Sequence, residues 1–119
     1  MSAIKKILIL DDDPEILELL SLILGNHYSL LTKINPDTLE KDLKEFQPHV
    51  ILIDHFIGDK TSHDIIKKSL NNMHIPIILH SAHEEIEKIS IQANVAGFIK
   101  KPSSIHEIRK CVARIVETT

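Results

Sequence analysis

The sequence predicts an α/β domain in which a doubly wound, five-stranded parallel sheet carries helices on both faces. Short apolar runs alternate with segments of helical periodicity along the whole chain. The clearest runs are continuously apolar, which is typical of strands buried on both faces. Strict alternation of strands and helices favours parallel strands that are joined by right-handed crossovers.

The first strand is expected over residues 7–10 and the first helix over residues 15–25. Asp13 is a suitable N-cap, and Pro14 suits the first helical turn. Gly25 marks the expected end of the helix. Apolar residues at helical spacing are expected to face the core, namely Ile16, Leu19, Leu20 and Ile23.

The middle of the chain repeats this pattern. A weaker strand is expected over residues 28–32, and Asn35 and Pro36 give a second cap-and-proline signal for a helix that Pro48 ends. A second strongly apolar strand covers residues 50–53. The inner face of the helix between these strands is predicted to hold Leu39, Leu43 and Phe46.

The remaining elements continue the alternation to the end of the chain. In order, they are a polar loop over 58–62, a helix over 64–70, a strand over 77–79 after Pro76, a helix over 84–93, a strand over 97–99, and a last helix opened by a capping box at 104–107. The last two helices are expected to bury Ile86, Ile89, Ala93, Ile105, Ile108, Val112 and Ile115.

Length and composition fit a single domain over residues 1–119, with no output domain expected. The chain has 119 residues, is 43% hydrophobic and carries a net charge of −3. This balance argues against direct nucleic-acid binding, and no apolar run is long enough for a membrane span, so a cytoplasmic protein is expected. The single cysteine, Cys111, excludes an intrachain disulfide and is expected to be a small buried hydrophobe.

Polar residues follow the ends of four predicted strands. Because parallel strands place their carboxyl ends at one edge of the sheet, these side chains are expected to converge there. The first strand is followed by Asp11 and Asp12, the third by Asp54, the fourth by His80 and Ser81, and the fifth by Lys101.

Carboxylates gathered in this way repel one another, and a hard divalent cation such as Mg²⁺ removes that cost. Asp12 is expected to bind the metal directly and Asp11 to bind it directly or through water, whereas Asp13 serves as a helix cap. Asp54 can act as a nucleophile toward phosphorus, with Mg²⁺ and Lys101 neutralising the transferred charge. Ser81 can donate a hydrogen bond to the phosphoryl group, or cap the following helix.

The chain resembles the receiver domain of two-component response regulators, which has a (βα)5, flavodoxin-like fold. The resemblance covers residues 7–116 and rests on four motifs in order. They are Ile-Leu-Ile-Leu-Asp11-Asp12-Asp13-Pro, Val-Ile-Leu-Ile-Asp54, Ile-Ile-Leu-His-Ser81-Ala and Gly97-Phe98-Ile-Lys-Lys101-Pro102.

The resemblance implies that Asp54 accepts a phosphoryl group from a phosphohistidine on a sensor histidine kinase or a histidine phosphotransfer protein. It implies a metal site of Asp11, Asp12, Asp54 and the backbone carbonyl of Phe56.

The resemblance also makes Ser81 and Phe98 switch residues. They are expected to alter the surface of the fourth helix, fifth strand and fifth helix, where a downstream protein binds. Such a domain catalyses its own phosphorylation and dephosphorylation but acts mainly as a switch. Receiver domains often pair through this surface, so a homodimer is compatible with the resemblance, and exposed Ile91 is a candidate partner contact.

Four positions depart from the family pattern. Gly58 and Ser62 stand where a proline and a glycine are common, so their loop is expected to be more mobile or differently shaped. Ser103 replaces the phenylalanine that usually follows Pro102, and Phe98 replaces a commoner tyrosine. None of these changes removes a catalytic group.

Two positions are expected to set the lifetime of the phosphoryl group. We hypothesise that the apolar ring of Phe56 shields the acyl phosphate from water, and that this outweighs any water positioned by His83. His55, His80 and His83 lie near the site in sequence, but no histidine pair has zinc-binding spacing on one predicted helix face.

Two other functions remain open at this stage. One is a receiver-like protein-binding module that works without phosphorylation, which the altered loop at residues 58–62 weakly favours. The other is a flavodoxin-like cofactor protein. That protein would need a phosphate-binding loop after the first strand, where the aspartate triplet at residues 11–13 would repel phosphate.

Overall fold

The computed structural model describes residues 4–71 and 73–118 of the chain. The elements are β1 (Lys6–Leu10), α1 (Pro14–Leu24), β2 (Ser29–Lys33), α2 (Leu39–Phe46), β3 (Val50–Ile53), β4 (Phe56–Ile57), β5 (Lys60–Thr61), α3 (Ser62–Ile65), the π-helix η1 (Ile66–Leu70), β6 (Ile77–Ser81), α4 (Ile86–Ala93), β7 (Gly97–Lys100) and α5 (Ile105–Glu117). The predicted alternation of strands and helices is confirmed.

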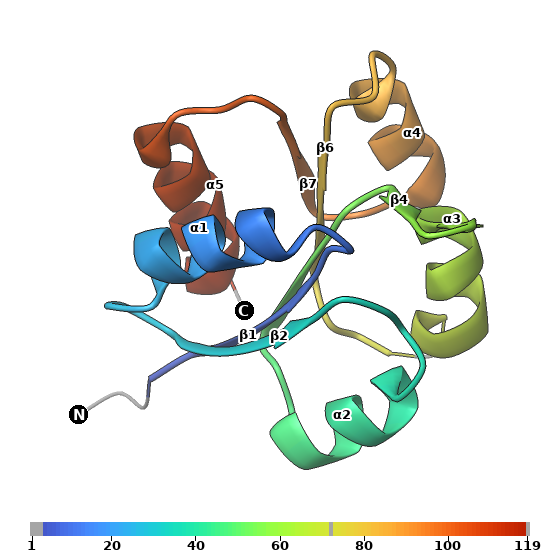
Figure 1. Cartoon of the computed structure of the whole chain (residues 1–119), viewed down its shortest axis with the longest axis horizontal. Helices are drawn as coiled ribbons and strands as arrows, with labels where there is room; N and C mark the ends of the chain where they lie inside the picture. The colour runs from blue at the N-terminus through green and yellow to red at the C-terminus, as the bar shows by residue number, and fades with distance from the viewer. Residues whose placement is uncertain (1–3, 72, 119) are drawn as a thin grey trace.

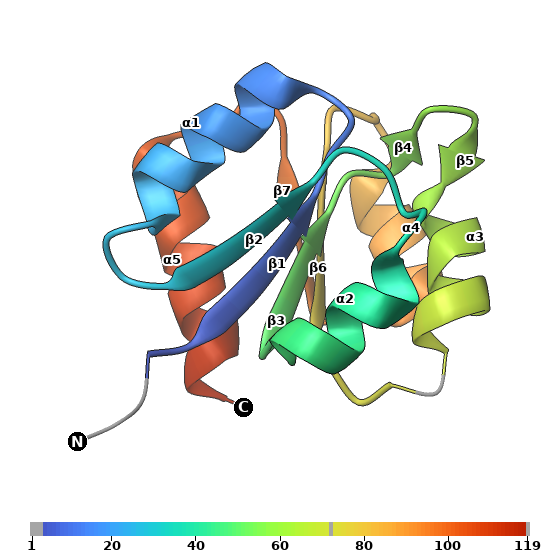
Figure 2. The same cartoon turned by 60° about the horizontal axis from the view of Figure 1, so that its bottom comes forward.

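The main sheet is parallel, with strand order β2-β1-β3-β6-β7. Helices α1 and α5 lie on one face, and α2, α3 and α4 lie on the other (Figures 1 and 2). Because strand side chains alternate between faces, each strand contributes to both layers of core. Ile7 and Ile9 pack on the α1–α5 side, while Leu8 and Leu10 pack on the other. The predicted doubly wound fold is therefore confirmed.

Capping interactions agree with the sequence at some helix ends and differ at another. The Asp13 side chain accepts a hydrogen bond from the N–H of Glu15 and caps α1 as predicted. Asn35 was expected to cap the second helix, but its side chain accepts from Asp37 N–H in a turn, and α2 begins later at Leu39. A local side-chain turn at Asn35 competes with a helix start at this point.

Two residues that were predicted to be buried are exposed. Leu19 is 47% exposed and Ile105 is 51% exposed, so both predictions were wrong. In α1, Leu17 is buried in place of Leu19, together with Leu20, Ile23 and Leu24. The helix carries apolar side chains around much of its circumference, so spacing alone does not fix which stripe faces inward. Ile105 is the first residue of α5, before the helix packs against the sheet.

The segment after β3 has a shape that sequence periodicity did not predict. Residues 56–61 form a short antiparallel hairpin of β4 and β5. Gly58 lies in its turn with φ of 60°, a conformation that glycine adopts without steric cost. The following helix begins at Ser62, two residues earlier than predicted, and continues as the π-helix η1. The expectation that this loop is more mobile or differently shaped than in the family pattern stays a prediction.

The strand order reverses between β1 and β3, because the chain passes from β1 out to β2 and then returns to β3. Ligands bind at the carboxyl ends of strands at such a switch point. The predicted site residues therefore fall at the expected edge of the sheet. Within the described residues, no helix is both long and apolar enough to cross a membrane.

Candidate functional site

The ends of β1 and β3 bring two aspartates next to each other. Leu10 pairs with Ile53 in the sheet, and the N–H of Asp54 donates to the carbonyl of Leu10 at 3.0 Å. Asp11 and Asp54 directly follow these strands, so the same edge of the sheet presents both carboxylates. Asp11 is buried and Asp54 is half-buried.

Asp12 completes an acidic cluster with this pair. One carboxylate oxygen from each of Asp11, Asp12 and Asp54 lies within 4.8 Å of the others. Exposure to solvent increases from buried Asp11 through half-buried Asp54 to exposed Asp12, so the cluster opens toward solvent on the Asp12 side. The predicted convergence of these three carboxylates is confirmed.

Lys101 connects the two inner carboxylates from the far edge of the sheet. Its Nζ donates to Oδ2 of Asp11 at 2.9 Å and to Oδ2 of Asp54 at 3.2 Å. The backbone N–H of Lys101 donates to the carbonyl of Ser81 at 2.9 Å, which fixes the chain just beyond β7. The side chain of Lys101 is only 17% exposed, so this is a placed ammonium rather than a solvated one.

Burial and nearby charge shift the pKa values of Asp11 and Lys101 in opposite directions. Burial raises the pKa of Asp11, although hydrogen bonds from the Asp13 backbone and from Lys101 oppose the rise. Burial alone would lower the pKa of Lys101, but the hydrogen bond to Asp11 and the charges of Asp54 and Asp11 outweigh it and raise that pKa. The ammonium of Lys101 therefore stays charged beside the carboxylates of Asp11 and Asp54.

Backbone N–H groups orient the carboxylates of Asp11 and Asp12. The N–H of Asp13 donates to Oδ1 of Asp11 at 3.0 Å. The N–H of Gly58 donates to Oδ2 of Asp12 at 2.9 Å, so the turn between β4 and β5 is tied to the acidic cluster. Phe56, whose carbonyl was predicted as a metal ligand, lies in β4 of this hairpin.

The donor set of the cluster fits a hard divalent cation. All the side-chain atoms that could bind a metal are carboxylate oxygens, the ligands that Mg²⁺ prefers. With all groups ionised, three carboxylates and the ammonium of Lys101 leave two negative charges in excess. A divalent cation neutralises that excess.

Comparison with known proteins decides the family. The family model of the response regulator receiver domain matches residues 7–113. This chain is a response regulator receiver domain. Receiver domains of two-component systems interact with histidine kinases or phosphotransfer proteins and with effector domains, and they generally bind Mg²⁺ at an acidic pocket.

Individual relatives agree with this assignment. The chain is 34% identical over 116 residues to the transcriptional regulatory protein KdpE of Staphylococcus aureus, covering 94% of this chain and 49% of that protein. It is also 34% identical over 107 residues to the nisin biosynthesis regulatory protein NisR of Lactococcus lactis, covering 87% and 46%. This receiver domain thus spans about half the length of these relatives.

A solved structure supports the fold as well. The N-terminal domain of the nisin resistance regulator NsrR, a lantibiotic response regulator, superposes with a TM-score of 0.85 and 25% sequence identity. The match covers 94% of this chain and 97% of that one.

The predicted switch residues occupy neighbouring strands of the receiver domain. Ser81 is buried at the end of β6, and Phe98 on β7 is 37% exposed. Within the described part of the chain, the Ser81 hydroxyl has one hydrogen bond, accepted from the N–H of His83 at 3.2 Å. This contact is a local turn before α4, which begins at Ile86 after Glu85 and has no side-chain cap, so the alternative role of Ser81 as a helix cap was wrong.

A ring cluster beside Asp54 was not predicted. The rings of His55 and Phe56 lie with centroids 4.5 Å apart, and His83 lies 5.6 Å from His55 and 5.7 Å from Phe56. His55 Nδ1 hydrogen bonds with the buried hydroxyl of Ser62 at 2.7 Å. Burial lowers the pKa of His55, with nearby His83 adding to the effect. His55 directly follows Asp54, and its polar side chain gave no indication in the sequence of this structural role.

Proposed function

We propose that Asp54 of this receiver domain accepts a phosphoryl group from a phosphohistidine, with Mg²⁺ held by Asp11, Asp12 and Asp54 and by the backbone carbonyl of Phe56. The observation that carries the proposal is the bridge from Lys101 Nζ to both Asp11 and Asp54, beside a third carboxylate. When bound, the cation supplies positive charge against the transferred phosphoryl oxygens.

The residues of the chain perform the rest of the transfer. A carboxylate oxygen of Asp54 forms the bond to phosphorus, while the bond between phosphorus and the donor imidazole nitrogen breaks and its electron pair stays on that nitrogen. The Lys101 ammonium is already within hydrogen-bond reach of the Asp54 carboxylate, so it can pair with the incoming oxygens without a large movement. Asp11 holds that ammonium in place.

Intact mass after incubation with acetyl phosphate tests this proposal, with and without Mg²⁺. We expect a Mg²⁺-dependent gain of one phosphoryl group in the wild type and none in Asp54→Asn. Asp59→Asn is the matched control, because Asp59 is an exposed aspartate in the β4–β5 turn. No gain under any condition, or an equal gain in Asp54→Asn, would contradict the proposal and favour the phosphorylation-independent binding module.

Metal binding can be measured separately from phosphorylation. Isothermal titration of the unphosphorylated chain with Mg²⁺ is expected to give an affinity that falls by roughly tenfold or more in Asp12→Ala, since a carboxylate ligand is lost. Asp59→Ala is expected to bind like the wild type. Equal affinity in all three proteins would exclude Asp12 from the metal site.

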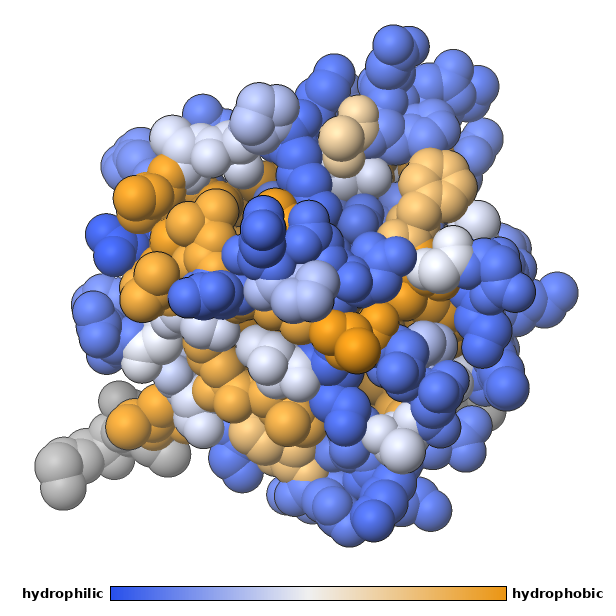
Figure 3. Space-filling view, viewed as in Figure 1, coloured by the Kyte–Doolittle hydropathy of each residue, from blue (hydrophilic) through white to orange (hydrophobic). Residues whose placement is uncertain are grey.

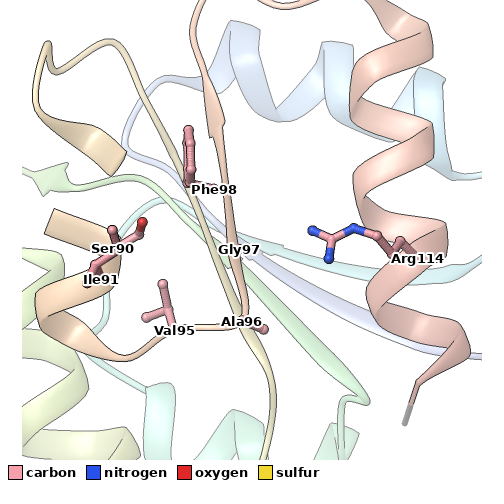
Figure 4. Close-up of a pocket in the computed structure, with 7 residues that line it drawn as sticks. All are labelled: Ser90, Ile91, Val95, Ala96, Gly97, Phe98 and Arg114. Atoms are coloured by element: carbon pink, nitrogen blue, oxygen red, sulfur yellow. The ribbon is translucent and has the colours of Figure 1, made fainter. Parts of the chain in front are cut away.

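We further propose that phosphorylation switches partner binding at the surface of α4, β7 and α5. This surface holds a shallow pocket of about 270 Å³ (Figure 4), lined by Ser90, Ile91, Val95, Ala96, Gly97, Phe98 and Arg114. Ile91 on α4 is 72% exposed, and the guanidinium of Arg114 extends from α5 toward β7. Ile91 and Arg114 line this pocket from opposite sides of β7, and exposed apolar side chains and arginines are common in protein contact surfaces.

The switch would use the two residues already placed on β6 and β7. When the Ser81 hydroxyl turns to donate to the phosphoryl group, it gives up its bond from the His83 N–H. The Phe98 ring, now partly exposed, would then turn inward and change the shape of the pocket at which Ile91 lies. This is a shift of population between two states.

A further inference from the structure

Two buried polar atoms remain without partners in the described part of the chain. Apart from His80 Nδ1 and Ser103 Oγ, every buried side-chain nitrogen or oxygen there has a hydrogen-bond partner. His80 ends the apolar part of β6, and Ser103 lies in the connection from β7 to α5. Both residues line the same cavity. Buried polar groups are normally paired, so two unpaired ones in one place require an explanation.

The cavity has a volume of about 330 Å³ and lies between α1, the end of β6 and the connection from β7 to α5. Its walls are largely apolar, with Ile16, Leu19 and Leu20 from α1 on one side and Pro102 and Ile108 on the other. The half-exposed side chain of Leu19 lies at this cavity. Apolar surface gathers over α1 in the same view as Figure 1 (Figure 3). This volume is within the range of small-molecule sites.

His80 provides the strongest sign of a ligand. Its side chain is on the α1–α5 side of the sheet, since Ile78 two residues earlier belongs to that core. The residue is 5% exposed, and its buried Nδ1 has no hydrogen-bond partner within the described residues. Burial, helped by the charge of Lys101, lowers the pKa of His80 to about 4. At neutral pH the ring is therefore uncharged and offers one donor and one acceptor.

Ser103 lines the cavity from the connection between β7 and α5, opposite α1. A phenylalanine, the residue that the family pattern favours after Pro102, would add a ring at a position that lines this cavity. Serine leaves that volume free and adds a hydroxyl whose oxygen is shielded from solvent without a partner.

We propose that this cavity binds a small neutral molecule with an apolar, ring-sized body and one hydroxyl group, which hydrogen bonds with His80 and Ser103. Charge excludes other ligand classes. Lys101 is the charged residue among those that line the cavity, and its ammonium is already paired with Asp11 and Asp54. A cation would be repelled by Lys101, and an anion would compete with the carboxylates that hold it. A hydroxyl group satisfies both orphan atoms without a net charge.

Phenol and toluene are matched probes for this site, because they have nearly the same shape and differ in one hydroxyl group. Each is titrated into the unphosphorylated chain, following backbone amides and the ring nitrogens of His80 by nitrogen-15 NMR. We expect phenol to shift amides around the cavity in α1, at the end of β6 and in residues 102–108, and to shift the His80 ring nitrogens. We expect toluene to bind about fivefold more weakly, since it lacks the hydrogen bond.

Two variants separate the cavity from the hydrogen bond. Ser103→Phe fills the cavity and is expected to abolish the phenol shifts, whereas Ser103→Ala keeps the volume and is expected to keep most of the binding. His80→Phe retains a ring and is expected to remove the preference for phenol over toluene. Because His80→Phe tests the bond independently, the proposal remains testable even if Ser103→Phe does not fold.

Three results would overturn the proposal. These are equal binding of phenol and toluene by the wild type, phenol shifts that map away from the cavity, and phenol shifts that persist in folded Ser103→Phe. None of these measurements requires Asp54 to be phosphorylated, so they are independent of the proposed phosphoryl transfer.

Discussion

The ammonium of Lys101 lies 3.2 Å from the carboxylate of Asp54, although 47 residues separate them in the chain. The same nitrogen is 2.9 Å from buried Asp11. Lys101 is therefore both a charge for the proposed chemistry and the partner of a carboxylate that has almost no contact with water.

Removing this ammonium should destabilise the fold. Lys101→Met leaves Asp11 buried without its partner, and breaking such a pair costs roughly 3 kcal/mol of unfolding free energy. Urea denaturation at pH 7 without Mg²⁺ measures the change. The control is Lys100→Met, because Lys100 is exposed and is expected to change stability by less than about 0.5 kcal/mol. The double variant Asp11→Asn/Lys101→Met should regain part of the loss, and equal stability of both lysine variants would contradict this account.

The lifetime of the phosphoryl group should depend on Phe56. Its ring packs edge-on against His55 and is 50% exposed, so it covers one side of the site while remaining accessible. Phe56→Ala is expected to lose the phosphoryl group several-fold faster than wild type, because water gains access to the acyl phosphate. Intact mass followed over time after removal of the phosphodonor gives both rates. Identical rates would refute the shielding hypothesis, and a faster rate in wild type would point to His83 instead.

Rotation of the Phe98 ring should be visible by fluorine NMR. The chain has three phenylalanines, so 4-fluorophenylalanine gives three signals that single variants can assign. We expect the Phe98 signal to shift on phosphorylation of wild type and to remain in place in Ser81→Ala, which lacks the hydroxyl that starts the change. Phe46 is the internal control, since it packs in the core on the α2 side. If the Phe98 signal moved equally in Ser81→Ala, the movement of the ring would not depend on the Ser81 hydroxyl.

His80 should make the protein less stable in mild acid. Its pKa is about 4 in the folded chain and near 6.5 when unfolded, so between these values the unfolded chain binds a proton that the folded chain does not. Stability is then unaffected above about pH 6.5 and falls by up to about 3 kcal/mol as the pH drops to 4. Urea denaturation across this range should show a shallower fall in His80→Phe. Parallel curves for the two proteins would mean that His80 is protonated in the folded state.

Much of this architecture could be predicted because it depends on local patterns. Four-residue apolar runs that end at an aspartate, as at Asp54, identify both a buried strand and the edge at which it presents its carboxylate. The capping signal at Asp13 was equally local. These features do not depend on which distant segment packs against them.

The parts that sequence did not predict depend on tertiary contacts. Whether Leu17 or Leu19 faces the core depends on how α1 is rotated about its axis. The role of His55 depends on a hydroxyl seven residues away, across a hairpin. The burial of His80 had a usable signal, because it lies two residues after a core isoleucine in a strand buried on both faces.

The position of Lys101 also determines when the site can exist. The pair of Lys101 and Asp11 spans 90 residues, and the lysine follows the last strand of the sheet. During synthesis, Asp11 and Asp54 emerge from the ribosome well before the lysine that unites them. A nascent or truncated chain that lacks β7 and Lys101 therefore carries the proposed acceptor Asp54 without the ammonium beside it. Reactivity of Asp54 toward a phosphodonor would then report that the final strand has docked.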